Sequence, residues 1–141
     1  MPPLTCNQPL RHTILLVEDE PFVREATCNL LESAGFCILP AADAHDALRI
    51  YDAWSRPIDL VMTDMVLPGC TGQELAADLL KRCPHLKILL TSGYETAEYA
   101  TEDPTTSVYF LPKPYSRRCL IEKVALILGM PMLVPAQSQA S

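Results

Sequence analysis

Residues 58–69, IDLVMTDMVLPG, carry the strongest structural signal in this chain. Their apolar run reaches Thr63 and Asp64, and Pro68 and Gly69 then break the chain. A continuous apolar run that ends in a turn signal is typical of a strand buried on both faces. Asp64 is then a carboxylate at the carboxyl end of a buried strand, where ligands bind in open parallel α/β sheets. The alternative is that Asp64 only initiates the turn before Pro68.

Similar apolar runs recur along the chain and alternate with helical patterns. The predicted strands are residues 13–17, 36–39, 58–64, 87–90 and 108–111. The predicted helices are residues 21–34, 43–56, 71–83, 94–106 and 116–128, of which 94–106 is the weakest pattern. Strands alternating with helices indicate βαβ units and a parallel sheet covered on both faces. The predicted fold class is therefore α/β, a doubly wound five-stranded parallel sheet flanked by helices.

Helix termini and apolar stripes support these helices. The first predicted helix has apolar residues at helical spacing, namely Phe22, Val23, Ala26, Leu30 and Leu31. Asp43 and Ser116 are suitable N-caps for the second and last helices. Thr71 and Glu74 have the spacing of a capping box, which predicts the start of the third helix.

Composition and length bound the possible functions. The chain has 141 residues, of which 49% are apolar and 20% charged, which is typical of a single globular domain. The net charge is −6 and the basic residues are scattered, so direct binding to nucleic acid is not expected. The expected organisation is a loose leader at 1–12, a domain at 13–129 and a frayed tail at 130–141.

The same sequence gives an expectation for the compartment. Residues 1–12 lack the apolar core of a signal peptide, and the apolar tract 124–136 is too short to span a membrane. The six cysteines form no CxxC pair, and Cys28, Cys37 and Cys119 lie within apolar patterns, where a free cysteine behaves as a small buried hydrophobe. These features favour a soluble cytoplasmic protein, although six cysteines leave a disulfide framework possible.

Four of the five predicted strands are followed by polar or charged side chains. The carboxyl ends of parallel strands lie along one edge of a sheet, so we expect these side chains to gather there. They are Glu18 and Asp19 after the first strand, Asp64 after the third, Thr91 and Ser92 after the fourth, and Lys113 after the fifth. Each has an ordinary structural explanation by itself, but together they require a coincidence at four strand ends.

The chemistry of this set is specific. Neighbouring carboxylates raise one another's pKa unless a cation lies among them. Oxygen ligands with room for water suit Mg²⁺. Lys113 adds a fixed positive charge, and Thr91 adds a hydroxyl and a backbone N–H. These groups can stabilise a phosphoryl group in transfer, and a carboxylate can itself accept it as an aspartyl phosphate.

The pattern resembles the receiver domain of two-component response regulators, the family of the bacterial chemotaxis regulator. The resemblance rests on LLVEDE at 15–20, VMTDMVLPG at 61–69, LLTSGY at 89–94 and FLPKPY at 110–115. It covers residues 13–129, nearly the whole chain. It implies a flavodoxin-like fold with strand order 2-1-3-4-5.

The resemblance also implies a role for each matching residue. Asp64 is expected to be the phosphoacceptor. Mg²⁺ is expected to be held by Asp19 and Asp64, by Glu18 through water, and by the backbone carbonyl of Val66. Phosphoryl oxygens are expected to be bound by Thr91, Ser92 and Lys113, and the switch to comprise Thr91 and the aromatic residue Phe110. The Lys113–Pro114 peptide bond is expected to be cis.

Two positions depart from the polar residues that the family often carries beside the phosphoryl group. Val66 stands two residues after Asp64, and Gly93 stands two residues after Thr91. Neither side chain can orient a water molecule, so spontaneous loss of the phosphoryl group is not expected to be fast. Glu18 replaces the more frequent Asp and keeps the charge.

The implied partner is a histidine kinase or a histidine phosphotransfer protein that donates the phosphoryl group. None of the three histidines of this chain, His12, His45 and His85, is expected at the acidic edge, so the donor belongs to another protein or domain. No output domain is expected after Gly129, which leaves a stand-alone regulator and a receiver of a hybrid sensor kinase as alternatives. The downstream protein partner, and whether phosphorylation causes dimerisation, stay open.

Three other functions compete with this interpretation. A Mg²⁺-dependent phosphatase with an aspartyl-phosphate intermediate would need a second acid two residues after Asp64, where Val66 stands. A nucleotide- or flavin-binding module would need a glycine-rich loop after the first strand, which instead ends in acids. A degenerate receiver that only binds partners would lack the key residues, which are all present. The expected protein is therefore a phosphoacceptor and not a turnover enzyme.

Overall fold

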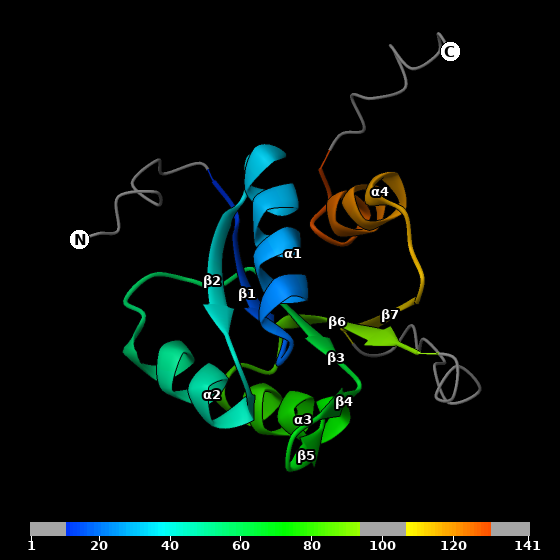
Figure 1. Cartoon of the computed structure of the whole chain (residues 1–141). Coiled ribbons are helices and arrows are strands. Elements are labelled where there is room, and N and C mark those ends of the chain that lie inside the picture. The colour runs from blue at the N-terminus through cyan, green and yellow to red at the C-terminus, as the bar shows by residue number, and fades with distance from the viewer. Residues whose placement is uncertain (1–10, 94–106, 131–141) are drawn as a thin grey trace, which may run out of the picture.

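The computed structural model describes residues 11–93 and 107–130 (Figure 1). Its main sheet has five parallel strands in the order β2-β1-β3-β6-β7. These are β1 (Thr13–Val17), β2 (Cys37–Ala41), β3 (Leu60–Asp64), β6 (Lys87–Ser92) and β7 (Val108–Pro112). Since β6 and β7 are the fourth and fifth strands of this sheet, the predicted fold class and the order 2-1-3-4-5 are confirmed.

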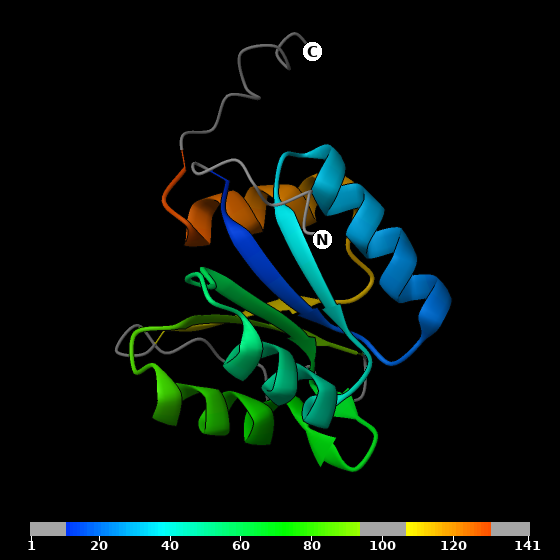
Figure 2. The ribbon, with the colours of Figure 1, turned by 90° about the vertical axis from the view of Figure 1, so that its left-hand side faces the viewer.

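Helices cover both faces of the sheet (Figure 2). They are α1 (Pro21–Ser33), α2 (Ala44–Ala53), α3 (Gly72–Arg82) and α4 (Arg117–Ile127). One core cluster lies under α1 and α4 and includes Ile14, Leu60 and Leu89. The other lies under α2 and α3 and includes Leu15, Val61 and Leu90. Neighbouring residues of a strand alternate between the two cores, which makes the strands apolar on both faces.

Three helices begin at the residues that the sequence indicates. Asp43 accepts a hydrogen bond from the N–H of Asp46, and Ser116 accepts one from Cys119. Thr71 and Glu74 form the predicted capping box, with both hydrogen bonds at 3.0 Å. The predicted fifth helical segment, residues 94–106, lies outside the described residues.

Several predicted boundaries differ from the structure. β2 runs to Ala41 instead of ending at Leu39, and it tolerates Pro40 because it is an edge strand. β3 begins at Leu60, two residues later than predicted, and α2 ends at Ala53, with Trp54 as its C-cap. α4 ends at Ile127, one residue earlier than predicted.

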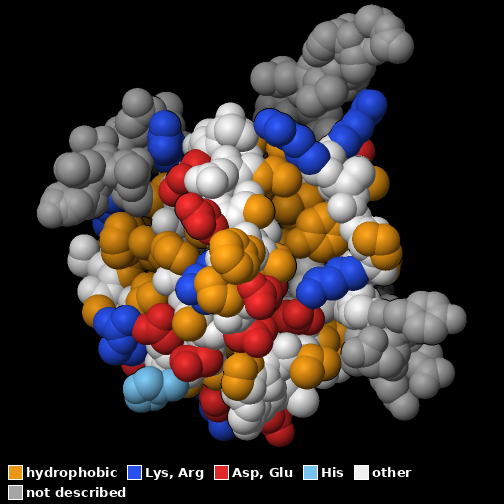
Figure 3. All heavy atoms as spheres, in the orientation of Figure 1, with side chains coloured by type: hydrophobic (Ala, Val, Ile, Leu, Met, Phe, Trp, Pro, Cys, Tyr) orange, Lys and Arg blue, Asp and Glu red, His pale blue; other side chains and the backbone are white. Residues whose placement is uncertain are grey.

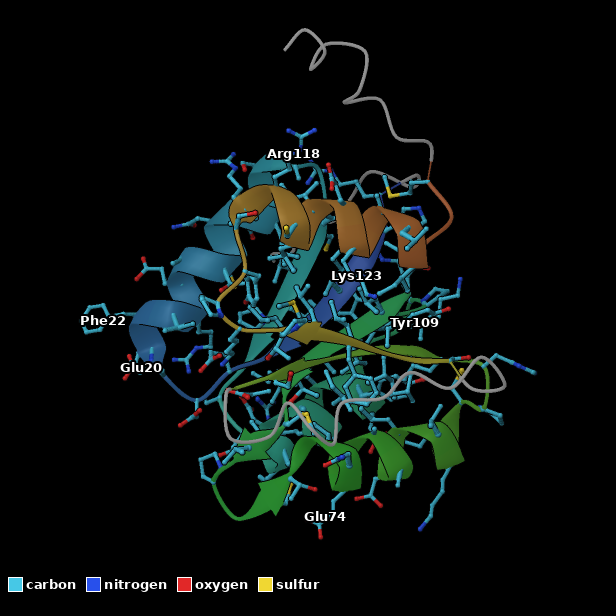
Figure 4. The ribbon with its side chains drawn as sticks, turned by 90° about the vertical axis from the view of Figure 1, so that its right-hand side faces the viewer. Glu20, Phe22, Glu74, Tyr109, Arg118 and Lys123 are labelled. Atoms are coloured by element: carbon cyan, nitrogen blue, oxygen red, sulfur yellow. The ribbon has the colours of Figure 1, made fainter. Side chains whose placement is uncertain are left out.

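The apolar stripe predicted for α1 is partly wrong. The helix buries Thr27 and Leu31, whereas Phe22 is 82% exposed and Val23 is 42% exposed. Phe22 points away from the body of the molecule (Figure 4). The first turn of α1 starts four residues after β1 ends, so its apolar side chains lie beyond the sheet edge and have no strand beneath them.

The cysteines also differ from the sequence-based expectation. Cys37 is buried and forms a disulfide bond, so it is not the free hydrophobe that its surroundings suggest. Cys119 is a free thiol but is exposed, and Cys28 is free and half-buried. No described helix is long and apolar enough to cross a membrane.

A small antiparallel hairpin, which the sequence did not reveal, connects β3 to α3. It consists of β4 (Val66–Leu67) and β5 (Cys70–Thr71), with Val66 paired to Thr71. Gly69 turns the chain with a φ of 79°, a conformation that favours glycine. The N–H of Gly72 donates to the carbonyl of Met65 at 2.8 Å, which brings the start of α3 against the end of β3.

Gly72→Ala tests this close approach. A Cβ atom at Gly72 would lie 2.3 Å from the backbone oxygen of Asp64, so either the hairpin or α3 must shift. Alanine would normally favour a helix, but we expect the clash to dominate and to lower the free energy of unfolding by about 2 kcal/mol. Urea unfolding measures the change, with the exposed neighbour Gln73→Ala as control. A neutral or stabilising Gly72→Ala would show that the contact is relaxed in solution.

Candidate functional site

The predicted polar residues do gather at the carboxyl edge of the sheet. Asp64 is the last residue of β3 and is directly paired with Thr91 of β6, and Thr91 is paired with Leu111 of β7. Paired residues in a parallel sheet point to the same face, and Leu111 belongs to the core under α1 and α4. Asp64, Thr91 and Lys113, two residues beyond Leu111, therefore share that face. Acidic side chains cluster at this edge, bordered by apolar and basic side chains (Figure 3).

The central contact of the site joins Lys113 to Asp64. The Nζ atom of Lys113 lies 2.8 Å from Oδ2 of Asp64. The Asp64 side chain is only 16% exposed and that of Lys113 is 33% exposed, so water screens this pair less than a surface ion pair. Burial by itself lowers the pKa of Lys113, but the hydrogen bond and the charge of Asp64, together with Glu18, raise it above its ordinary value. Lys113 therefore stays protonated.

Glu18, which follows β1, belongs to an acidic pocket that we define by Glu18, Asp19 and Asp64. It is 8% exposed, its N–H donates to the carbonyl of Ala41, and its Oε2 accepts from the N–H of Glu20 at 3.1 Å. Burial raises the pKa of Glu18, and the charges of Asp64 and Asp19 raise it further, against the hydrogen bond from Glu20 and the charge of Lys113. The three acids are thus close enough to interact, and Asp19 is the exposed member.

The loop after β3 and the end of β6 are tied together by backbone hydrogen bonds. The N–H of Met65 donates to the carbonyl of Thr91 at 3.0 Å, and the N–H of Lys113 donates to the carbonyl of Ser92 at 2.8 Å. The N–H of Val66 makes only a long contact of 3.5 Å with Oδ1 of Asp64. The Val66 side chain is 56% exposed beside the site and carries no polar group.

Thr91 and Ser92 lie on opposite faces of the sheet. Thr91 is 3% exposed and shares the face of Asp64, whereas Ser92 follows Leu90 on the face of α2 and α3. The Ser92 hydroxyl is buried and makes no hydrogen bond to the described residues. A role for Ser92 in binding a phosphoryl group at Asp64 would therefore fall to its backbone N–H and not to its hydroxyl.

Phe110 is half-buried on β7, where it pairs with Leu90 and packs against the core under α2 and α3. It is thus a core aromatic residue on the face opposite Asp64, one residue before the partner of Thr91. The Lys113–Pro114 peptide bond is cis, as the resemblance implied.

The donor atoms of this edge fit Mg²⁺. Mg²⁺ takes one or two carboxylates and completes its shell with water and substrate oxygens. Asp19 and Asp64, with the carbonyl of Val66, are the residues that would hold such an ion. In residues 11–93 and 107–130, no group of three or more Asp, Glu, His or Cys side chains is arranged so that it could hold a metal ion by itself. Two carboxylates and one backbone carbonyl would need water and substrate oxygens to complete the shell of the ion.

Two residues at this edge were missed by the sequence interpretation. Glu20 is the N-cap of α1, because its Oε1 accepts from the N–H of Phe22. Arg24 donates through Nη1 to the carbonyl of Glu18 at 2.8 Å. The polar Arg24 within the first turns of a helix that follows the acids was the available signal, but its side-chain direction could not be known from spacing alone.

Comparison with known proteins identifies the family. Residues 14–125 match the response regulator receiver domain. The chain is 36% identical over 117 residues to the sensor kinase CckA of Brucella abortus, a match covering 82% of this chain and 12% of that protein. It is 33% identical over 115 residues to the response regulator FleR of Pseudomonas aeruginosa, covering 79% of this chain and 24% of that protein. The chain belongs to the response regulator receiver domain family.

Solved structures agree with this assignment. The receiver domain of the hybrid histidine kinase CckA superposes with a TM-score of 0.70 at 35% identity, covering 82% of this chain and 98% of that one. The response regulator TrrA of Thermotoga maritima, solved in complex with Mg²⁺-BeF, superposes with a TM-score of 0.71 at 30% identity, covering 83% of this chain and 99% of that one. The protein is thus a receiver domain of two-component signalling, a family of phosphoacceptors. It spans 12% and 24% of the length of the curated relatives CckA and FleR.

Glu18→Gln tests the electrostatics of the acidic pocket. Because the pKa of Glu18 is raised in the folded state, the native protein binds this proton more tightly than the unfolded chain does. The contribution of Glu18 to the stability of the metal-free protein therefore falls as pH rises above the ordinary Glu value of 4.5. We expect Glu18→Gln to raise the Tm at about pH 7 and to lose this advantage at about pH 4.

Thermal unfolding in metal-free buffer at both pH values checks this expectation. The exposed Glu25→Gln on α1 removes the same charge away from the pocket and is the control. An advantage of Glu18→Gln that is equal at both pH values would mean that ionisation of Glu18 does not strain the folded state.

Proposed function

We propose that this receiver domain accepts a phosphoryl group on Asp64 from a phosphohistidine of a histidine kinase or a histidine phosphotransfer protein. The observation that carries this proposal is the 2.8 Å contact between Lys113 and Oδ2 of Asp64, on the sheet face shared with Thr91. Lys113 holds one carboxylate oxygen, while Oδ1 has only the long contact with Val66 N among the described residues. Oδ1 is therefore the oxygen that attacks phosphorus.

In this transfer the P–N bond of the donor breaks as the bond from Asp64 to phosphorus forms, and the donor imidazole leaves with the electron pair. The Lys113 ammonium offsets the negative charge that the phosphoryl group brings. The Thr91 hydroxyl and the backbone N–H of Ser92 are the donors for phosphoryl oxygens. Asp19, Asp64 and the Val66 carbonyl would hold Mg²⁺, which would supply further charge neutralisation.

Phosphorylation would then act through Thr91 and Phe110. A hydrogen bond from the Thr91 hydroxyl to a phosphoryl oxygen displaces β6, and Phe110 on the neighbouring strand responds from the opposite face. The proposed output is a change in the surface that binds a downstream protein. The similarity to a sensor kinase and to a response regulator supports a kinase donor and is compatible with both a stand-alone regulator and a hybrid kinase receiver.

Phosphorylation by a small donor tests the acceptor directly. We expect the native protein to gain the mass of one phosphoryl group from acetyl phosphate, in a reaction that requires Mg²⁺. Asp64→Asn should gain none, because an amide oxygen cannot form the acyl phosphate. Intact-mass spectrometry measures both. If the native protein gains no mass from acetyl phosphate or from a phosphohistidine donor, Asp64 is not a phosphoacceptor and the chain is a binding module.

The lifetime of the aspartyl phosphate tests the roles of Val66 and Gly93. Neither side chain can position a water molecule for attack on phosphorus, so we expect a half-life well beyond seconds. Val66→Asn places an amide at the exposed position beside Asp64 and should shorten the lifetime. Loss of the phosphoryl mass with time gives the rate, with Val66→Ala as the apolar control. A half-life of seconds for the native protein would contradict the expectation that Val66 and Gly93 do not support attack by water.

A further inference from the structure

The turn between β1 and α1 is held by a side chain that the proposed phosphoryl-transfer chemistry does not use. Arg24 lies in the second turn of α1, about 200° around the helix from the outward-pointing Phe22 (Figure 4). Its half-buried side chain therefore turns back toward the sheet edge. There Nη1 donates to the carbonyl of Glu18 at 2.8 Å. A hydrogen bond from a guanidinium to a partly buried carbonyl is stronger than one between neutral groups.

Arg24 binds this turn through both its backbone and its side chain. Its backbone N–H donates to the carbonyl of Glu20 at 2.8 Å, while its guanidinium holds the carbonyl of Glu18. The remaining hydrogen bonds of the turn run from the Glu18 N–H to Ala41 and from the Glu20 N–H to the Glu18 carboxylate. The residues on both sides of Asp19 are thus held by hydrogen bonds, and the side chains of Glu20 and Arg24 link them to α1.

Asp19 depends on this arrangement. It is exposed, and its carboxylate accepts no hydrogen bond from the described residues. Its backbone lies between two residues that are held by hydrogen bonds, and these neighbours set the point from which its carboxylate extends. Among the described residues Arg24 makes no ion pair, so the structure gives no sign that its charge is used to neutralise an acid.

We propose that Arg24 is a positioning residue for Mg²⁺, which presents Asp19 to the metal by clamping the carbonyl of Glu18. The proposal rests on the Mg²⁺ site of the proposed function. Residues that orient metal ligands without touching the metal contribute to its affinity, and their loss weakens binding by about tenfold or more.

Substitution of Arg24 separates positioning from charge because the two effects have opposite signs. Loss of a nearby positive charge should by itself tighten the binding of a divalent cation. Loss of the clamp should weaken it. We expect Arg24→Met to raise the Kd for Mg²⁺ by about tenfold, measured by following backbone amides of the pocket in a Mg²⁺ titration by NMR. Arg24→Lys keeps the charge and a single donor, and should give an intermediate Kd.

The control is Arg82→Met, which removes one positive charge from a side chain that pairs with Asp52 on α2. It should leave the Kd unchanged or slightly lower. The Tm without Mg²⁺ is measured for each variant, since a merely structural role would lower the Tm without changing the Kd. If Arg24→Met does not fold, the Kd of Arg24→Lys is compared with that of the native protein. A raised Kd at an unchanged Tm supports the positioning role, and an unchanged Kd contradicts it.

Three results would overturn the proposal. An unchanged or lower Kd in Arg24→Met would show that Arg24 does not position Asp19. A lower Tm in both Arg24→Met and Arg24→Lys, with the Kd of each equal to that of the native protein, would assign Arg24 a structural role. A native protein that binds no Mg²⁺ would overturn the metal site of the proposed function and this inference with it, which the titration of the native protein alone reveals.

Discussion

The ion pair between Lys113 and Asp64 is the interaction on which the acidic edge depends. Three carboxylates lie close together there, and one of them, Glu18, is almost completely buried. Without a positive charge among them, their mutual repulsion would favour protonation or an open structure. Lys113 compensates one carboxylate only. Glu18 stays in an environment that raises its pKa, mainly because it is buried and also because Asp64 and Asp19 carry like charges.

The fold delivers these groups from distant parts of the chain. Asp64 and Lys113 are 49 residues apart in sequence, yet parallel pairing of β3, β6 and β7 places them on one face of one edge. The strand pairing also restricts which residues can occupy the segments that follow the strands. The start of α3 must come so close to Asp64 that only glycine fits at residue 72. The same backbone contact that packs α3 therefore also fixes the loop beside the Asp64 carboxylate.

Much of this could be predicted from the sequence, because the relevant signals are local. The apolar run before Asp64 and the capping box at Thr71 and Glu74 each depend on a few consecutive residues, and the structure confirms both. The predictions that were wrong concern features that depend on where a residue lies in the fold. Phe22 and Val23 have ideal helical spacing, but periodicity cannot show that the first turn of α1 extends past the sheet edge. Pro40 looks like a strand terminator unless β2 is known to be an edge strand.

At the site, too, features set by local sequence were predicted and features set by the three-dimensional arrangement were not. The positions of the strand ends predicted that the carboxylates, Thr91 and Lys113 lie together, because a parallel sheet gathers the residues that follow its strands at one edge. The clamp of Arg24 on the Glu18 carbonyl could not be predicted, since it depends on the direction of one side chain. The opposite faces of Thr91 and Ser92 follow from strand pleating but need the observed register to be assigned.

The register also constrains how a signal could leave the site. Thr91 lies on the face of Asp64 and α1, whereas Phe110 packs in the other core, under α2 and α3. The two side chains therefore extend from opposite faces of the sheet. A movement of Thr91 would be transmitted by the backbone of β6, where the carbonyls of Thr91 and Ser92 accept hydrogen bonds from the N–H groups of Met65 and Lys113. The strand would then connect the acidic edge to the opposite layer of the molecule.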